Sequence, residues 1–125
     1  MLQNLVLLSV AGAAGTLARY GMSEIVSHLL GRRFPWSTLS VNLLGSLLFG
    51  LVWTLADERK LISPQAGLVI LTGFMGAFTT FSTFAFESGQ LLSAAKWDLL
   101  FANVAAQNGL GLLAVFAGRA VARWM

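Results

Sequence analysis

Residues 72–87 read TGFMGAFTTFSTFAFE, and they interrupt what is otherwise a continuous apolar segment. Within them, Gly73 and Gly76 are followed by Thr79 and Thr80, and all four residues weaken an α-helix. The segment as a whole is long enough to cross a membrane once. The stretch therefore predicts a transmembrane helix broken near mid-membrane, where freed backbone groups must be paired or must line a polar cavity.

The composition is that of a membrane protein. Of the 125 residues, 57% are hydrophobic and only 10% are charged, whereas soluble domains carry about 25% charged residues. Segments long enough to span a bilayer use nearly all of the chain, and they cover about residues 3–30, 37–56, 66–92 and 99–121. We expect one all-α domain of four transmembrane helices, of which the third is broken.

Residue types argue against several classes of function. The chain has no cysteine and a single histidine, His28, so neither a thiolate nor a clustered-histidine metal site is expected. It contains no nucleotide-binding motif and no pair of catalytic carboxylates, so we do not expect an enzyme. The net charge of +3 comes from cations spread singly or in pairs, so we expect no nucleic-acid partner.

Lysines and arginines are divided almost equally between the two sides of the membrane. With the N-terminus inside, the inner side holds Arg59, Lys60, Arg123 and, at the end of the fourth span, Arg119, while the outer side holds Arg32, Arg33 and Lys96. The positive-inside rule needs a clear asymmetry to fix orientation. The balance predicts a dual-topology chain that assembles as an antiparallel homodimer. The alternative is a small difference that arose by chance in a short sequence.

Small and amide side chains share helix faces and predict close packing between helices. One face of the fourth span holds Asn103, Gln107, Gly111, Ala114 and Gly118, and one face of the second holds Thr38, Asn42, Gly45 and Ser46. For Asn103, Gln107 and Asn108, helix packing and contact with a transported species remain equal alternatives.

Arg19 lies within the first span, where a cation costs at least about 2.5 kcal/mol. We expect it to face a water-filled vestibule, where it would raise the local anion concentration. The alternative is a side chain that snorkels to the lipid headgroups.

The residues around the break predict a path for an anion. Ser82 and Thr83 can donate hydroxyl hydrogens, and the ring edges of Phe81 and Phe84, on one helix face, carry partial positive charge. Carbonyls freed at the break are ligands for a hard cation. The alternative for both phenylalanines is simple packing or contact with lipid.

Three stretches resemble the Fluc family of bacterial fluoride channels: GFMGAFTTFSTFAFE at 73–87, SVNLLGSLLFG at 40–50 and AGAAGTLARY at 11–20. The resemblance implies an antiparallel dual-topology homodimer in the lipid bilayer of the cell inner (cytoplasmic) membrane. It also implies two pores for passive export of toxic fluoride and a central structural Na⁺ at the dimer interface. By position, the fluoride pore residues would be Phe81, Phe84, Asn42, Ser82 and Thr83, the vestibule residue Arg19, and the Na⁺ ligands the backbone carbonyls of Gly76 and Thr79.

Some residues depart from that family pattern. Ala77 stands where a second glycine is expected, Ala85 where a serine is frequent, and the adjacent Gln107 and Asn108 match no family pattern. Glu87 falls where the family motif has an acidic residue, with no role that the sequence supplies.

Two other functions remain open on sequence grounds. A small dual-topology, proton-coupled multidrug exporter would share the four spans, but it needs a carboxylate within the membrane. Here Glu24 and Glu87 lie near the ends of their spans, while the charge at mid-membrane is positive. The second alternative is a structural subunit of a larger complex, whose polar faces only dock partners.

Overall fold

A computed structural model describes residues 1–125, and all of its regular elements are helical. The elements are α1 (Leu2–Leu30), α2 (Trp36–Trp53), η1 (Thr54–Glu58), α3 (Pro64–Leu68), η2 (Val69–Met75), α4 (Gly76–Phe78), α5 (Phe81–Ser93), α6 (Trp97–Ala105), η3 (Ala106–Leu110) and α7 (Gly111–Trp124), where η denotes a π-helical segment. They form four apolar helices of membrane length, Leu2–Leu30, Trp36–Glu58, Pro64–Ser93 and Trp97–Trp124. The prediction of an all-α membrane protein with four such helices is confirmed.

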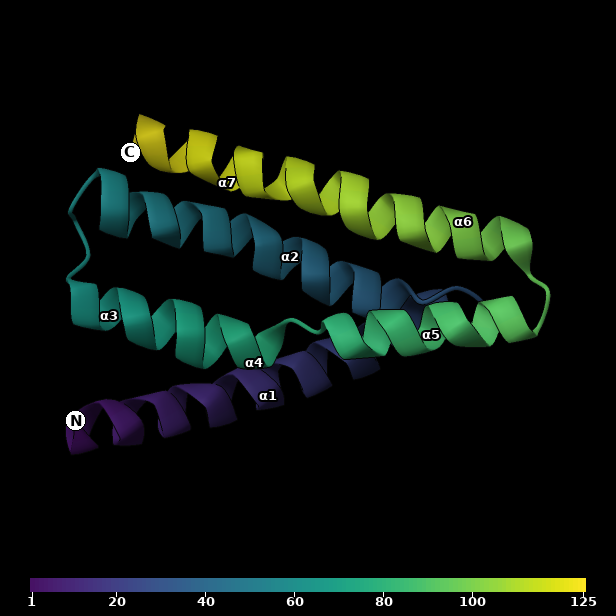
Figure 1. Cartoon of the computed structure of the whole chain (residues 1–125), viewed down its shortest axis with the longest axis horizontal. Helices are drawn as coiled ribbons and strands as arrows, with labels where there is room; N and C mark the ends of the chain where they lie inside the picture. The colour runs from purple at the N-terminus through teal and green to yellow at the C-terminus, as the bar shows by residue number, and fades with distance from the viewer.

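The four helices lie side by side, and both termini are at one end of the molecule together with the connection between η1 and α3 (Figure 1). The connection from α5 to α6 lies at the opposite end (Figure 1). Helices joined by such short loops are antiparallel neighbours. The third helix therefore begins at the end that holds the termini, and its two halves lie beside α1 and α2.

Local signals set where the third helix begins. The Ser63 side chain accepts a hydrogen bond from the Ala66 N–H group at 3.2 Å, and Pro64 occupies the first helical position. The helix therefore starts two residues before the expected 66. Each of the other expected ranges also lies inside its helix, since sequence-based boundaries omit the polar first and last turns.

The third helix is broken near its middle, as predicted, but the break is made by threonines rather than by glycines. Thr79 (φ −81°, ψ 161°) and Thr80 (φ −152°, ψ 113°) are extended. Gly73 and Gly76 stay helical, and a Cβ atom at Gly73 would come within 2.8 Å of Ala11 Cβ on α1. The expectation that these glycines weaken the helix is corrected, because Gly73 permits close packing instead.

Glycines also allow α2 and α7 to approach closely. A Cβ atom at Gly50 would overlap the carbonyl oxygen of Val115, and one at Gly118 would overlap the carbonyl oxygen of Leu47. Gly15 of α1 packs in the same way against the carbonyl of Phe74. Without a hydrophobic force between helices in lipid, this close backbone contact is what holds the bundle together.

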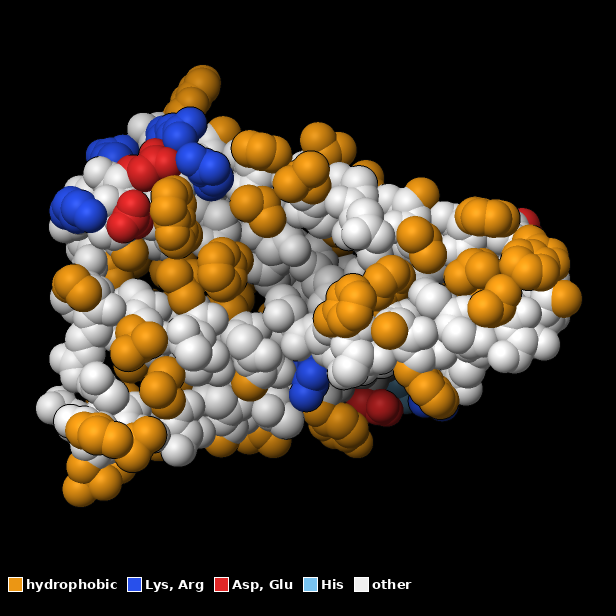
Figure 2. All heavy atoms as spheres, viewed as in Figure 1, with side chains coloured by type: hydrophobic (Ala, Val, Ile, Leu, Met, Phe, Trp, Pro, Cys, Tyr) orange, Lys and Arg blue, Asp and Glu red, His pale blue; other side chains and the backbone are white.

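Most side chains face outward. Only 15 of 125 residues are buried, and large apolar side chains cover the visible face (Figure 2). Charged side chains gather most densely at the end near the C-terminus (Figure 2). Such a surface suits lipid and further protein, with charges at the membrane boundary.

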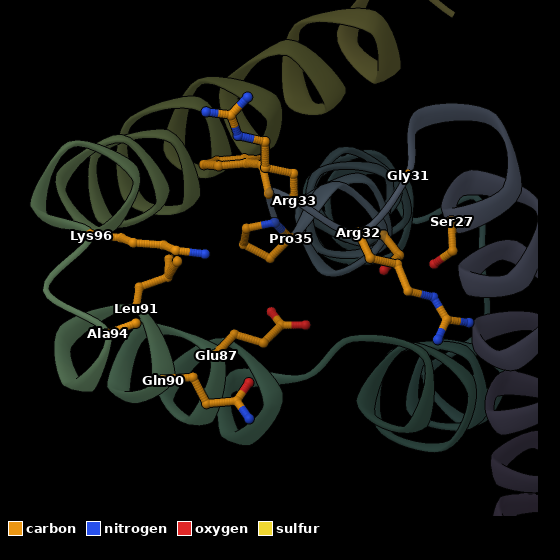
Figure 3. Close-up of a pocket in the computed structure, with 12 residues that line it drawn as sticks. Ser27, Gly31, Arg32, Arg33, Pro35, Glu87, Gln90, Leu91, Ala94 and Lys96 are labelled. Atoms are coloured by element: carbon orange, nitrogen blue, oxygen red, sulfur yellow. The ribbon is translucent and has the colours of Figure 1, made fainter.

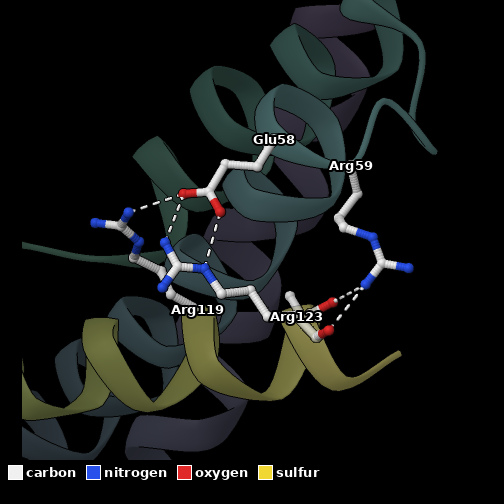
Figure 4. Close-up of polar contacts among 5 residues, drawn as sticks. Glu58, Arg59, Arg119 and Arg123 are labelled. Carbon is white, nitrogen blue, oxygen red and sulfur yellow. Dashed lines mark hydrogen bonds and ion pairs between the residues drawn. The ribbon is translucent and has the colours of Figure 1, made fainter.

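At that charged end, hydrogen bonds and ion pairs join the η1 region to α7 (Figure 4). Glu58 accepts hydrogen bonds from Arg119 Nη2 at 2.8 Å and from Arg123 Nε at 2.9 Å. Arg59 Nη1 donates to the carbonyl oxygens of Ala122 and Arg123, at 3.1 and 3.0 Å, and so caps the end of α7. Sequence patterns alone do not reveal this cluster, since its members lie about sixty residues apart in the chain.

Candidate functional site

Asn42 of α2 lies opposite the break and replaces hydrogen bonds that the broken helix loses. Its Oδ1 atom accepts from the Thr80 N–H group at 2.8 Å, and its Nδ2 atom donates to the Thr80 carbonyl at 3.0 Å. The same Nδ2 atom donates to Gln107 Oε1 on η3 at 3.1 Å. One amide therefore links the second, third and fourth spans at the point where the backbone is open.

A cavity of about 310 Å³ lies beside this link. Its apolar wall is formed by Phe49, Phe81, Phe84 and Val115, and its polar wall by Gly45, Asn42, Ser46, Thr79, Thr80, Gln107 and Asn108. No charged side chain lines it. The structure thus brings Asn42 and both predicted phenylalanines to one cavity, together with Gln107 and Asn108, whose role the sequence left open.

The two phenylalanines meet edge to face, with ring centroids 5.5 Å apart and planes at 63°. Phe84 is half-buried, whereas the Phe81 side chain is 78% exposed and points away from its own chain's core. An aromatic ring left so exposed beside a polar cavity has room to contact another chain.

Ser82 and Thr83 are exposed and do not line this cavity. They form a hydroxyl cluster with Thr80, whose Oγ1 atom donates to Thr83 Oγ1 at 2.9 Å and lies 3.3 Å from Ser82 Oγ. Because the single hydroxyl hydrogen of Thr80 is used on Thr83, Ser82 is the donor in the second contact. Thr83 alone keeps a free hydroxyl hydrogen.

The backbone carbonyls that the break frees include those of Gly76 and Thr79. In a continuous helix, Gly76 O would accept from the Thr80 N–H group, which instead donates to Asn42 Oδ1 at 2.8 Å. Thr79 O would accept from the Thr83 N–H group, which instead donates to Thr80 Oγ1 at 3.2 Å. The two predicted Na⁺ ligands are therefore unpaired hard oxygen donors, which fits a hard cation.

Arg19 is half-buried on α1 and forms no ion pair with its own chain. It does not line the cavity beside the break. Its position in a vestibule stays a prediction.

A second cavity, of about 450 Å³, opens at the end opposite the termini. Lys96 extends across it toward Glu87. The guanidinium group of Arg32 points toward α1 and that of Arg33 points to the opposite side, so both point away from the cavity (Figure 3). Glu87 Oε1 accepts from Thr38 Oγ1 at 2.8 Å. The sequence did not predict this cavity. It offered one signal, which is that Thr38 and Glu87 each share a helix face with a predicted pore residue: Thr38 lies four residues before Asn42, and Glu87 four after Thr83.

Asn103, the remaining amide of the fourth span, is fully buried and donates from Nδ2 to Ser88 Oγ on α5 at 3.1 Å. It lines neither cavity. Of the two alternatives for Asn103, its contacts in the structure are those of helix packing.

The fold and the site together define a small helical membrane protein whose neutral polar cavity is built around a broken helix. The family model for "CrcB-like protein, Camphor Resistance (CrcB)" matches residues 6–119. The chain therefore belongs to the CrcB family, as the resemblance implied, and it is a multi-pass protein of the inner membrane.

Curated relatives cover almost the whole chain. The "Fluoride-specific ion channel FluC" of Solidesulfovibrio magneticus is 56% identical over 123 residues, 98% of each chain. The protein of the same name from Nitrosococcus oceani is 52% identical over 118 residues, 94% of each chain. That of Maridesulfovibrio salexigens is 44% identical over 116 residues, 93% of this chain and 92% of the relative. These relatives are ion channels by name, and the chain is not an enzyme.

Proposed function

We propose that this chain is a fluoride-selective channel that lets fluoride leave the cell passively and so protects the cell from its toxicity. The observation that carries the proposal is the cavity beside the break, where amide groups and two aromatic rings meet without a charged side chain. The names of the relatives point to the same ion.

The chemistry of the cavity suits a small, strongly hydrated anion. A selective path must replace the water around the ion with N–H and O–H donors. It must also release the ion, which a full cation in the wall would hinder. The amides of the cavity, with the positive edges of Phe81 and Phe84, attract an anion without binding it too tightly.

The same cavity argues against a proton-coupled drug exporter. No carboxylate lines it, and Glu87 is hydrogen-bonded to Thr38 in the other cavity. A cationic drug would find no countercharge beside the break.

The functional unit of this proposal is an antiparallel homodimer of chains with opposite orientation. One end of the chain carries Arg59, Lys60, Arg119 and Arg123 with Asp57 and Glu58, and the other carries Arg32, Arg33 and Lys96 with Asp98. With four cations at one end and three at the other, the chain lacks the clear asymmetry that would favour one orientation. The exposed ring of Phe81 is then available to a pore wall shared by two chains.

The proposal includes a structural Na⁺ between the two chains. The freed carbonyls of Gly76 and Thr79, contributed by both copies, would supply its oxygen ligands. Exchange of Na⁺ for N-methylglucamine is expected to weaken the dimer in detergent, as measured by glutaraldehyde cross-linking. An equal dimer yield in both salts would remove the ion from the proposal.

Flux through purified protein in liposomes tests the proposed function. We expect rapid fluoride efflux without a proton gradient, with little chloride efflux, and strong loss of fluoride flux in Phe81→Ile and Phe84→Ile. Exchange of a cationic drug for protons would instead indicate an exporter, and no transport at all would indicate a subunit of a larger complex. If both isoleucine variants conduct normally, the aromatic edges have no part in conduction.

A further inference from the structure

Lys96 is held in place by the tight turn that joins α5 to α6, at the end of the molecule opposite the termini. Ala95, just before it, has a left-handed backbone (φ 52°), which an alanine keeps only where the surrounding structure imposes it. The N–H groups of Ala94, Ala95 and Lys96 each donate to a carbonyl of the last turn of α5 at 3.0 Å. The turn therefore fixes the point from which the Lys96 side chain leaves the backbone.

From that point, the Lys96 ammonium group extends into the cavity of about 450 Å³, toward Glu87 (Figure 3). The two groups are not in ion-pair contact, and Lys96 pairs with no other carboxylate of the chain. Arg32 and Arg33 point away from the cavity (Figure 3). Lys96 is thus the one cation of the chain that is directed into this cavity.

The cavity lies close to the cavity beside the break. Phe84 lines the cavity beside the break, and Glu87, three residues later on α5, lines the cavity of Lys96. Three residues of an α-helix span about 4.5 Å. An anion that passes the aromatic pair toward this end of the chain therefore meets Glu87 next, and a negative carboxylate repels it. A positive charge across the cavity opposes that repulsion.

We propose that Lys96 captures anions at this end of the path: its ammonium group raises the anion concentration in the cavity and offsets the carboxylate of Glu87. The inference rests on the proposed function and adds a residue that acts through its charge, away from the break. The ligand is a small inorganic anion, with fluoride as the probe. In a wide, hydrated cavity the ammonium attracts the ion without removing its water, so the ion is free to leave again.

The chain has no native cysteine, so one introduced cysteine can be given either charge after the protein has inserted into a membrane. We expect Lys96→Cys to lower the single-channel fluoride current in planar bilayers about threefold at low ionic strength. Aminoethyl methanethiosulfonate, which attaches an ammonium group, should restore most of the current, and sulfonatoethyl methanethiosulfonate, which attaches a sulfonate, should lower it further. In about 1 M sodium isethionate these differences should shrink, because charges are then screened within about 3 Å.

Arg33→Cys is the matched control. It removes the same charge from the same end of the chain, but Arg33 points away from the cavity, so neither the substitution nor either reagent should change the current.

Three results would overturn the assignment. They are a Lys96→Cys current that equals wild type and responds to neither reagent, a lost current that the ammonium reagent does not restore, and an equal response of Arg33→Cys to both reagents. If the wild-type protein itself carries no fluoride current, the proposed function fails first, so the two failures are distinguishable.

Discussion

The amide of Asn42 and the backbone of Thr80 form a reciprocal pair: Thr80 N–H donates to Asn42 Oδ1 at 2.8 Å, and Asn42 Nδ2 donates to Thr80 O at 3.0 Å. Two spans that are distant in sequence are joined in this way at the one place where the third helix has no helical bonds of its own. The break is therefore a fixed structure rather than a flexible gap.

Asn42→Ala should destabilise the protein, because it leaves the N–H and C=O groups of Thr80 unpaired. Each buried unpaired group costs about 1–3 kcal/mol, so we expect a clear fall in the melting temperature of the purified protein in detergent.

The control for that change is Asn108→Ala. The Asn108 amide is exposed and bonds only to a carbonyl of its own helix, so its removal should change stability by less than about 0.5 kcal/mol. Equal melting temperatures for wild type and Asn42→Ala would show that the pair contributes nothing.

Gly118→Ala should separate α7 from α2. Its Cβ atom would overlap the carbonyl oxygen of Leu47, and neither backbone can move without losing the contact along both helices. Overpacking of this kind costs about 1–3 kcal/mol. The control is Gly89→Ala, whose Cβ atom would meet nothing within 4 Å and which should stabilise α5 by about 0.5–1 kcal/mol. Thermal unfolding followed by circular dichroism compares the two, and similar melting temperatures would contradict the packing argument.

The sequence predicts the fold well because membrane helices have a strong compositional signal and the break has a strong local one. It also predicts that Asn42, Phe81 and Phe84 act together, since each stands out by type and spacing. It does not reveal that Asn42 closes the break, because that depends on a partner in another span. For the same reason, the bond between Asn42 and Gln107 and the bond between Thr38 and Glu87 become visible only once the helices are packed.

The nearly equal numbers of lysines and arginines at the two ends, four and three, make orientation easy to change. Replacing Arg32 and Arg33 with Gln leaves Lys96 as the only cation at that end, so we expect all copies to insert with the N-terminus inside. Antiparallel pairs then cannot form, and fluoride flux should be lost. The chain has no native cysteine, so labelling of a single Ala95→Cys residue from each side of the membrane reports the orientation directly.

Co-expression provides the control for that loss. Leu30→Lys and Ser93→Lys with Lys60→Gln place five cations at the end that holds Lys96 against three at the other, and so favour the opposite orientation. Mixing the two oppositely biased chains should restore flux that neither gives alone. Full flux from the first variant by itself would show that parallel or single chains conduct.

The contact of Glu58 with Arg119 and Arg123 should make the joint between η1 and α7 sensitive to salt. These charges lie near the membrane boundary, where dissolved ions screen them over about 10 Å at 0.1 M salt. Glu58→Gln should therefore lower the melting temperature in low salt, and the difference from wild type should shrink in 1 M salt. Asp57→Gln is the control, since Asp57 pairs only with the exposed Lys60 at 3.7 Å and should have no measurable effect. A deficit of equal size in both salts would mean that Glu58 stabilises the joint by packing rather than by its charge.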